Sequence, residues 1–152
     1  MSFHLQSSPI DLASLRAQMQ DLSCGAAVWF EGRVRDHNEG RSVLRLEYEA
    51  YEPLCRSEAQ RIIEEARQRW AIQKALCVHR DGLLELGEIA VVTAVAAAHR
   101  DEAFQAARYI IDEVKHRLPI WKREHYSNGE LRWVNCQRCA DTGHRHPQSR
   151  AG

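Results

Sequence analysis

The sequence predicts an α+β protein with mostly antiparallel strand pairing and three main helices. Three segments repeat apolar residues every three or four positions, which is the spacing of one helical face. Between them lie segments that alternate apolar and polar residues or stay apolar throughout, as strands do. The predicted order is one helix followed by two strands, three times over, which favours an α+β fold.

The first helix is predicted from Ser8 to Leu22. Ser8 offers an N-cap, Pro9 suits the first helical turn, and Gly25 follows the helix end. A strand is predicted next, because two sets of residues alternate along it. One set is small or apolar (Ala26, Val28, Phe30, Gly32 and Val34), and the other combines Trp29 with the charged residues Glu31, Arg33 and Arg35.

A hairpin partner is expected for that strand. Leu44, Leu46 and Tyr48 alternate with charged residues, and the turn-rich stretch "DHNEGRS" before them predicts a long hairpin loop. The second helix is predicted from Leu54 to Trp70, behind Pro53, with its charged face in solvent.

The second half of the chain continues the pattern. The stretch "KALCVHRDG" predicts a strand that ends in a turn. The stretch "EIAVVTAVAAAHR" predicts a strand buried on both faces, although its alanines would also allow a helix. A third helix has its apolar face from Phe104 to Leu118 and must end at Pro119. Two short strands, from Ile120 and from Leu131, flank "SNG".

Composition limits the possible functions. The chain has 152 residues, the size of one domain, and its 21 basic residues are balanced by 21 acidic ones. No excess of positive charge would therefore attract nucleic acid. No segment has the apolar length of a signal-peptide core or a membrane span, and five scattered cysteines do not resemble a disulfide framework. We expect a cytoplasmic protein with reduced thiols that binds neither nucleic acid nor membranes.

The C-terminal residues differ from the rest of the chain. Residues 1–135 are predicted to form the domain, and residues 136–152 a polar, flexible tail. The tail contains "CQRC" and "HRH", which have metal-ligand residue types. A zinc site needs four well-placed ligands, and these pairs lie close together in a glycine-containing stretch, so we favour a tail without metal.

Three His-Arg pairs occur in the chain, at His79-Arg80, His99-Arg100 and His144-Arg145. The first pair precedes Asp81-Gly82, a hairpin turn signal, so we expect it at the surface, and the third lies in the tail. The second pair opens the third helix, where free N–H groups and the helix dipole favour an anion. A capping histidine with a solvated arginine is an equal alternative.

Two lysines could border an anion site. Lys115 falls in the last turn of the third helix, so its ammonium should border the core, although bonding to the last helical carbonyls is common for such a lysine. Lys122 lies in an extended segment, on the same side as Ile120. A partly buried lysine can take part in acid–base chemistry. Arg33 and Arg35 add charge from another element, and the spacing leaves open whether all four converge.

Four blocks of the sequence resemble the large, catalytic subunit of molybdopterin synthase: "FEGRVRDHNEG", "VHRDGLLELGE", "AHRDEAFQAARYIIDEVKHRLPIWKRE" and the closing "RWV". They occur in that family's order and cover most of the chain from Gly25 to Val134. The resemblance implies an α/β hammerhead-type fold. It also implies a homodimer that carries a small, ubiquitin-like sulfur-carrier subunit on each outer end, which makes a heterotetramer.

The resemblance also implies a reaction. Enzymes of this family convert cyclic pyranopterin monophosphate to molybdopterin by inserting two sulfurs as a dithiolene. The sulfur arrives as a thiocarboxylate on the C-terminal Gly-Gly of the small subunit, and no metal or organic cofactor is required. The tail with Cys136 and Cys139 departs from the family's pattern.

The same resemblance assigns site residues. Lys115 and Lys122 are the implied catalytic residues, acting in proton transfer. The implied substrate-binding residues are Arg33, Val34, Arg35, His99, Arg100, Lys115, Lys122, Arg123 and Glu124. Arginines can fork onto the oxygens of a cyclic phosphate, and lysines can act as compact charges. A non-catalytic module that binds a phosphorylated small molecule or an acidic partner tail could use the same cluster, and the sequence leaves that alternative open.

Overall fold

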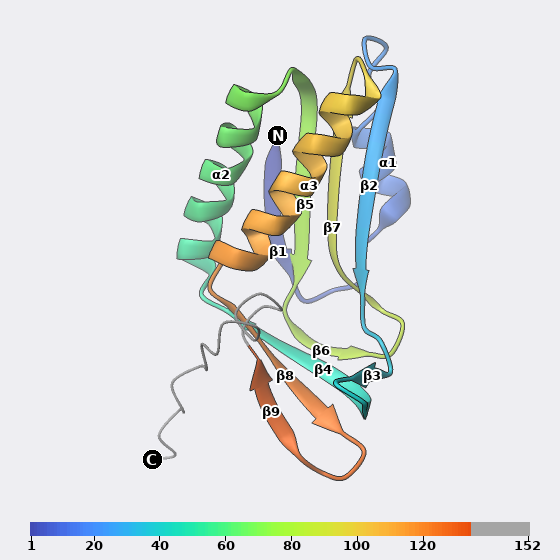
Figure 1. The fold of residues 1–152 in the computed structure, drawn as a ribbon, viewed down its shortest axis with the longest axis vertical. Coiled ribbons are helices and arrows are strands. Elements are labelled where there is room, and N and C mark those ends of the chain that lie inside the picture. Colours follow the sequence, from blue (N-terminus) through green and yellow to red (C-terminus); the bar gives the residue numbers. More distant parts are fainter. Residues whose placement is uncertain (135–152) are drawn as a thin grey trace.

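The computed structural model describes residues 1–134, which form three helices and nine strands in two sheets (Figure 1). The three helices and the mostly antiparallel pairing confirm the α+β class expected from the sequence. No helix in these residues is long and apolar enough to cross a membrane.

The first sheet has the strand order β1-β5-β7-β2. Its strands are β1 (Ser2–Gln6), β5 (Ile72–Arg80), β7 (Ile89–Ala97) and β2 (Ala26–Arg33). β1 pairs parallel with β5, and the other neighbours pair antiparallel. Every residue of β7 except the first is buried, which confirms the strand expected for "EIAVVTAVAAAHR" and excludes a helix there.

Helices cover both faces of this sheet, which explains why β7 is apolar on both sides. α2 (Glu52–Arg69) and α3 (Arg100–Arg117) lie on one face, and the short α1 (Leu12–Gln18) lies on the other (Figure 1). Val91 belongs to the core beneath α2 and α3, and Val92 belongs to the core beneath α1. The predictions for α2 and α3 are confirmed, except that Phe104, expected on the apolar face of α3, is 60% exposed.

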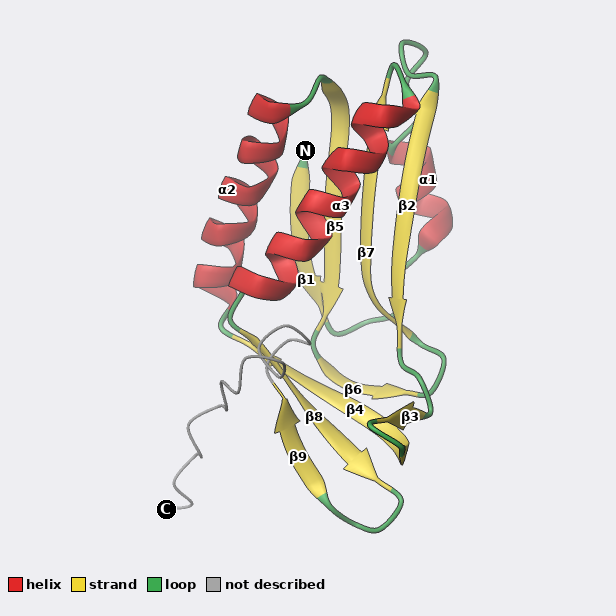
Figure 2. Ribbon diagram, viewed as in Figure 1, coloured by secondary structure: helices red, strands yellow, loops and turns green. Residues whose placement is uncertain are grey.

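A second sheet lies across the end of the first one, below the C-terminal end of α3 in Figure 2. It contains β3 (His37–Asn38), β4 (Arg41–Ala50), β8 (Ile120–Tyr126) and β9 (Leu131–Val134) in that order, and β6 (Gly82–Glu85) also pairs with β4. β8 and β9 confirm the two strands expected around "SNG".

The prediction that a hairpin joins the strand from Ala26 to the strand near Leu44 is wrong. β2 pairs with β7 in the first sheet, whereas β4 pairs with β6 and β8 in the second. The stretch "DHNEGRS" turns within the second sheet, between β3 and β4, where Glu39 and Gly40 have φ of 49° and 74°. The chain therefore changes sheets between β2 and β3.

The first helix is shorter than expected, and a strand precedes it. α1 begins at Leu12, because the Asp11 side chain accepts a hydrogen bond from the Ser14 N–H at 3.1 Å and caps the helix. Ser8, the expected cap, lies in the connection from β1. The sequence did not predict β1, because five residues are too few to show a clear alternation.

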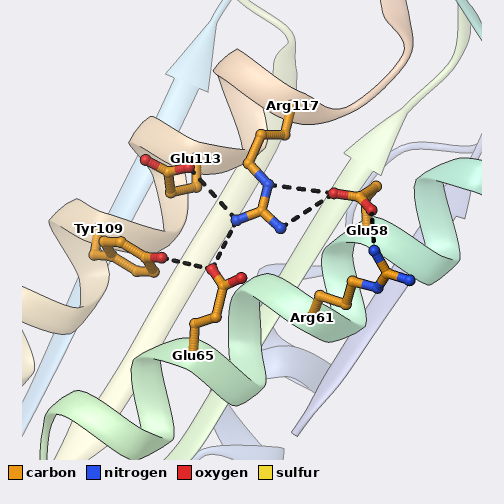
Figure 3. Close-up of polar contacts among 6 residues, drawn as sticks. All are labelled: Glu58, Arg61, Glu65, Tyr109, Glu113 and Arg117. Atoms are coloured by element: carbon orange, nitrogen blue, oxygen red, sulfur yellow. Dashed lines mark hydrogen bonds and ion pairs between the residues drawn. The ribbon is translucent and has the colours of Figure 1, made fainter.

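One arginine ties the end of α3 to α2 (Figure 3). Arg117 Nη1 donates to Glu65 at 2.7 Å, and Nε and Nη2 donate to Glu58 at 3.2 and 3.1 Å. Nη1 also lies 3.6 Å from Glu113, and the Tyr109 hydroxyl donates to Glu65 at 2.5 Å. We call these five residues the α2–α3 clamp.

Candidate active site

A cavity of about 240 Å³ lies where α3, the first sheet and the second sheet meet. Part of its lining is apolar and includes Val91, Val114, Leu118 and Ile120. Its polar and charged lining residues are Arg33, Arg35, His37, Asn38, Tyr48, His79, Lys115, Lys122 and Glu124. We call it the cationic pocket, because two arginines and two lysines face a single carboxylate.

Arg33 reaches the pocket at the end of β2, beside a bulge in β7. The register between the two strands shifts between Gly32 and Arg33, where Ala90 is the extra residue of β7. A Cβ at Gly32 would lie 2.6 Å from Val91 Cγ1, so the close approach requires glycine. Gly32 and Arg33 both line the pocket, and Arg33 donates to Glu31 at 2.6 Å.

Two of the chain's three lysines line the pocket. Lys115 lies in the last turn of α3, which ends before Pro119 as predicted. Lys122 lies on β8 and lines the pocket together with Ile120, as the strand alternation predicted. The Lys122 side chain is 19% exposed, whereas Lys115 occupies an exposed position of α3. The third lysine, Lys74, donates to two backbone carbonyls near the end of α1.

The buried carboxylate of Glu124 organises one side of the pocket. It lies 3.2 Å from Lys122 Nζ, and its residue is 2% exposed. Asn38 Nδ2 donates to this carboxylate at 2.9 Å, and the Tyr126 hydroxyl donates to it as well. Asn38 Oδ1 in turn accepts from Arg35 at 2.9 Å. The Glu124 carboxylate therefore connects two cations of the pocket. It pairs directly with Lys122, and it is linked to Arg35 through Asn38.

The expectation that His79 and Arg80 lie at the surface is wrong. β5 is a central strand between β1 and β7, and the two residues are 8% and 5% exposed. Arg80 donates to the Ser7 carbonyl at 2.8 Å and lies 3.4 Å from Glu88. His79 lines the pocket, and its ring stands edge-on to that of Tyr48 at 5.1 Å. The sequence reasoning missed both aromatic residues as parts of the site.

Burial keeps these two rings uncharged. Burial raises the pKa of Tyr48 to about 12, with a contribution from Glu124. Burial lowers the pKa of His79 to about 4, with a contribution from the charge of Lys115. Near neutral pH, the pocket therefore combines two neutral rings with its charged arginines and lysines.

Two residues implied by the resemblance point away from the pocket. Val34 is 3% exposed and packs in the core of the second sheet. Arg123 alternates with the pocket-lining residues of β8, so it faces the other side of that strand. There it donates to Glu47 and lies over the Trp133 ring at 4.9 Å.

Two further residues lie at the other end of α3. His99 is the residue before the first turn of α3, and Arg100 begins the helix. Fifteen residues separate Arg100 from Lys115, which is roughly 22 Å along a helix axis. The structure does not bring His99 or Arg100 to the pocket of their own chain.

The described residues offer no alternative metal or thiol site. In residues 1–134, no group of three or more His, Cys, Asp or Glu side chains is placed to hold a metal ion. Cys24, Cys55 and Cys77 are free thiols, and none of the three lines the pocket. Burial raises the pKa of Cys55 to about 11 and that of Cys77 to about 12. The "CQRC" and "HRH" stretches lie outside the described residues.

The fold and the pocket define an α+β protein with a cation-lined cavity. Its relatives identify the family. The family model described as MoaE protein matches residues 5–117. The molybdopterin synthase catalytic subunit of a Nostoc species is 39% identical over 143 residues, covering 93% of this chain and 87% of that protein. The same subunit of Pyrococcus abyssi is 47% identical over 122 residues, covering 80% and 82%. The chain therefore belongs to the MoaE family, the catalytic subunits of molybdopterin synthase in molybdenum cofactor biosynthesis.

Solved structures agree with this assignment. Molybdopterin synthase from Staphylococcus aureus superposes with a TM-score of 0.82 at 34% identity, covering 87% of this chain and 96% of that one. A Helicobacter pylori complex of subunits 1 and 2 of molybdopterin-converting factor shares the fold, with a TM-score of 0.72 at 19% identity over 99% of this chain and 97% of that one. The fold implied by the sequence resemblance is confirmed.

Proposed function

We propose that the cationic pocket binds cyclic pyranopterin monophosphate and inserts the two sulfurs that give molybdopterin. The observation that carries this proposal is that Lys115 and Lys122, from α3 and β8, line one cavity. A cyclic phosphate is an anion, and the pocket sets four cationic side chains against one carboxylate. The apolar lining, which includes Val114 and Ile120, suits a planar pterin ring.

The pocket residues have distinct roles in this proposal. Arg33 and Arg35 bind phosphate oxygens, because a guanidinium fork matches them. Lys115 and Lys122 transfer protons when the cyclic phosphate opens and when sulfur replaces oxygen. Glu124 holds Lys122 in place through the 3.2 Å ion pair. These groups and an incoming sulfur donor supply the chemistry without a metal or organic cofactor.

The sulfur donor in this proposal is the C-terminal Gly-Gly thiocarboxylate of a small, ubiquitin-like subunit. Glycines allow an extended tail to pass close to pocket walls. The Helicobacter pylori relative, which is a complex of two subunits, supports a partner of this kind. We place this sulfurtransferase in the cytoplasm.

The proposed assembly is a homodimer within a heterotetramer. His99 precedes α3 and Arg100 begins it, far from the pocket of their own chain, so they can contact substrate only in the pocket of a second copy. Mixed dimers of Lys115→Ala and Arg100→Ala subunits test this arrangement. Each parent should be inactive, whereas random exchange restores one intact pocket in half of the dimers, or about a quarter of wild-type activity. No recovery, with exchange verified by native mass spectrometry, would remove Arg100 from the site.

Lys115→Ala tests the catalytic proposal directly. With thiocarboxylated small subunit and cyclic pyranopterin monophosphate, molybdopterin formation should fall on the order of 10²–10⁴-fold. Lys115→Arg keeps the charge but does not release a proton at neutral pH, so it separates anchoring from proton transfer. Lys74→Arg is a matched control outside the pocket and should retain activity.

Two outcomes would contradict this reading. A folded Lys115→Ala variant that turns over within about threefold of wild type would show a loss too small for either role, and Lys122 would be tested next. A wild-type protein that binds the cyclic precursor but forms no product with the thiocarboxylated partner would favour a binding module instead.

A further inference from the structure

His79 occupies the pocket without a role in the chemistry described above. It lies on β5, is 8% exposed, and shares the cavity with Lys115 and Lys122. Its strand is held on both sides, since His79 is in register with Leu5 of β1 and with Val91 of β7. The ring is therefore fixed on a rigid part of the first sheet.

One ring nitrogen of His79 is already engaged. Nδ1 lies 2.7 Å from the Arg80 carbonyl oxygen, which can only accept a hydrogen bond, so Nδ1 carries the proton. In a neutral imidazole, Nε2 is then the acceptor. Within residues 1–134, no hydrogen bond to Nε2 is found, and the ring stands edge-on to Tyr48 at an interplanar angle of 77°.

Few buried hydrogen-bond acceptors line the pocket: apart from His79 there is the Tyr48 hydroxyl, which can also donate, and the side chain of His37 is 67% exposed. Its arginines and lysines only donate, and Glu124 already receives Asn38, Tyr126 and Lys122. Asn38 Oδ1 already accepts from Arg35. Burial lowers the pKa of His79 to about 4, so at neutral pH its Nε2 is a lone-pair acceptor that repels phosphate oxygens.

We propose that His79 is a further substrate-contacting residue, whose Nε2 accepts a hydrogen bond from an N–H or O–H group on the substrate's ring system. A reduced pterin offers such donors, whereas its phosphate offers only acceptors at neutral pH. His79 therefore sets the orientation of the ring, and the arginines and lysines hold the phosphate. This inference rests on the proposed function, because it takes the ligand to be a phosphorylated pterin.

Three substitutions of His79 distinguish the loss of the hydrogen-bond acceptor from the loss of ring packing. His79→Phe keeps an aromatic ring against Tyr48 but has no acceptor. His79→Gln places an amide oxygen near the position of Nε2 and restores one. His79→Asn places its amide near Nδ1, where it can still donate to the Arg80 carbonyl, but offers nothing at Nε2. His79→Asn therefore also tests the loss of the acceptor if the His79→Phe variant does not fold.

The readouts are KM for cyclic pyranopterin monophosphate and inhibition by inorganic phosphate. His79→Phe and His79→Asn should raise KM by about 10- to 100-fold, as expected when a buried donor of the ligand loses its partner. His79→Gln should recover most of that loss. Inhibition by inorganic phosphate should match wild type in all three variants, which a distorted pocket would not allow.

Contrary results identify which proposal fails. If wild type is active and the His79→Phe and His79→Asn variants keep its KM, the inference is wrong and the proposed function stands. If the variants lose both phosphate inhibition and substrate affinity, His79 has only a structural role. If wild type neither binds nor converts the cyclic precursor, the proposed function fails, and this inference fails with it.

Discussion

Arg117→Met is expected to lower the free energy of unfolding by about 2 kcal/mol. The Arg117 side chain is 24% exposed and contacts Glu58, Glu65 and Glu113, whose side chains are 20%, 36% and 25% exposed. Exposed ion pairs contribute roughly 0–1 kcal/mol, and removing one partner of a buried pair costs roughly 3–5 kcal/mol. The α2–α3 clamp lies between these cases, and methionine preserves much of the packing of the arginine stem.

The stability lost in Arg117→Met should depend on pH. The hydrogen bond from Arg117, followed by that from Tyr109, lowers the pKa of Glu65 below its ordinary value of 4.5. Because the folded-state pKa is the lower one, this stabilisation is fully present above the unfolded-state pKa and is lost as pH falls through the folded-state value. The stability difference between wild type and Arg117→Met should therefore narrow as the pH drops below 4.5.

Urea denaturation and thermal melting measure this effect. A loss of about 2 kcal/mol corresponds to a decrease in Tm of roughly 6 °C for a chain of this size. Arg108→Met is the matched control on the same helix, because Arg108 is 77% exposed and pairs with Asp112, so its loss should cost under about 0.5 kcal/mol. Equal stability of the two variants, or no coupling to Glu65→Gln in a double-mutant cycle, would refute the reasoning.

Three further predictions concern the site, the thiols and the tail. Glu124→Gln should lower turnover on the order of 10²-fold while the protein stays folded, because it removes the charge that positions Lys122; kinetics and circular dichroism measure this. Cys77 should resist iodoacetamide at pH 8 in the native protein, because burial raises its pKa to about 12, and mass spectrometry would detect any adduct. Truncation after Asn135 should leave molybdopterin formation within about twofold of the full chain, because a polar tail contributes little core; substantial loss of activity would contradict the predicted domain limit.

Local patterns predicted much of the fold and the placement of two pocket residues, Lys115 and Lys122. The apolar spacing of α2 and α3 depends on neighbouring turns of one helix, so the sequence alone shows it. Proline at position 119 ends α3, and alternation from Ile120 places Lys122 on one face of β8. These local signals placed each lysine beside the core but left open whether the two converge; the family resemblance implied that they do, and the structure places both in one pocket.

The remaining features of the fold and the pocket depend on long-range strand pairing and on strand irregularities, which the sequence alone did not show. His79 precedes a glycine turn that normally marks the surface, but β1 and β7 enclose its strand, and β1 gave no signal of its own. A register shift between Val43 and Arg45 buries Val43 and leaves Leu44 48% exposed, so Leu44 departs from the expected apolar face, whereas Leu46 stays on it. Which strands pair, and where a bulge resets alternation, depends on partners far away in the chain.

Because the chain has few lysines, reagents that react with amines would act largely on the pocket. The sequence has three lysines; Lys115 and Lys122 line the pocket, and Lys74 donates to two backbone carbonyls near the end of α1. Acylating reagents, fluorescent succinimidyl esters and amine-coupled sensor surfaces would therefore modify the site itself at two of the three lysines. Protection of Lys115 and Lys122 from acylation gives a direct footprint of any bound ligand, and labelled preparations of this protein should be coupled through another group.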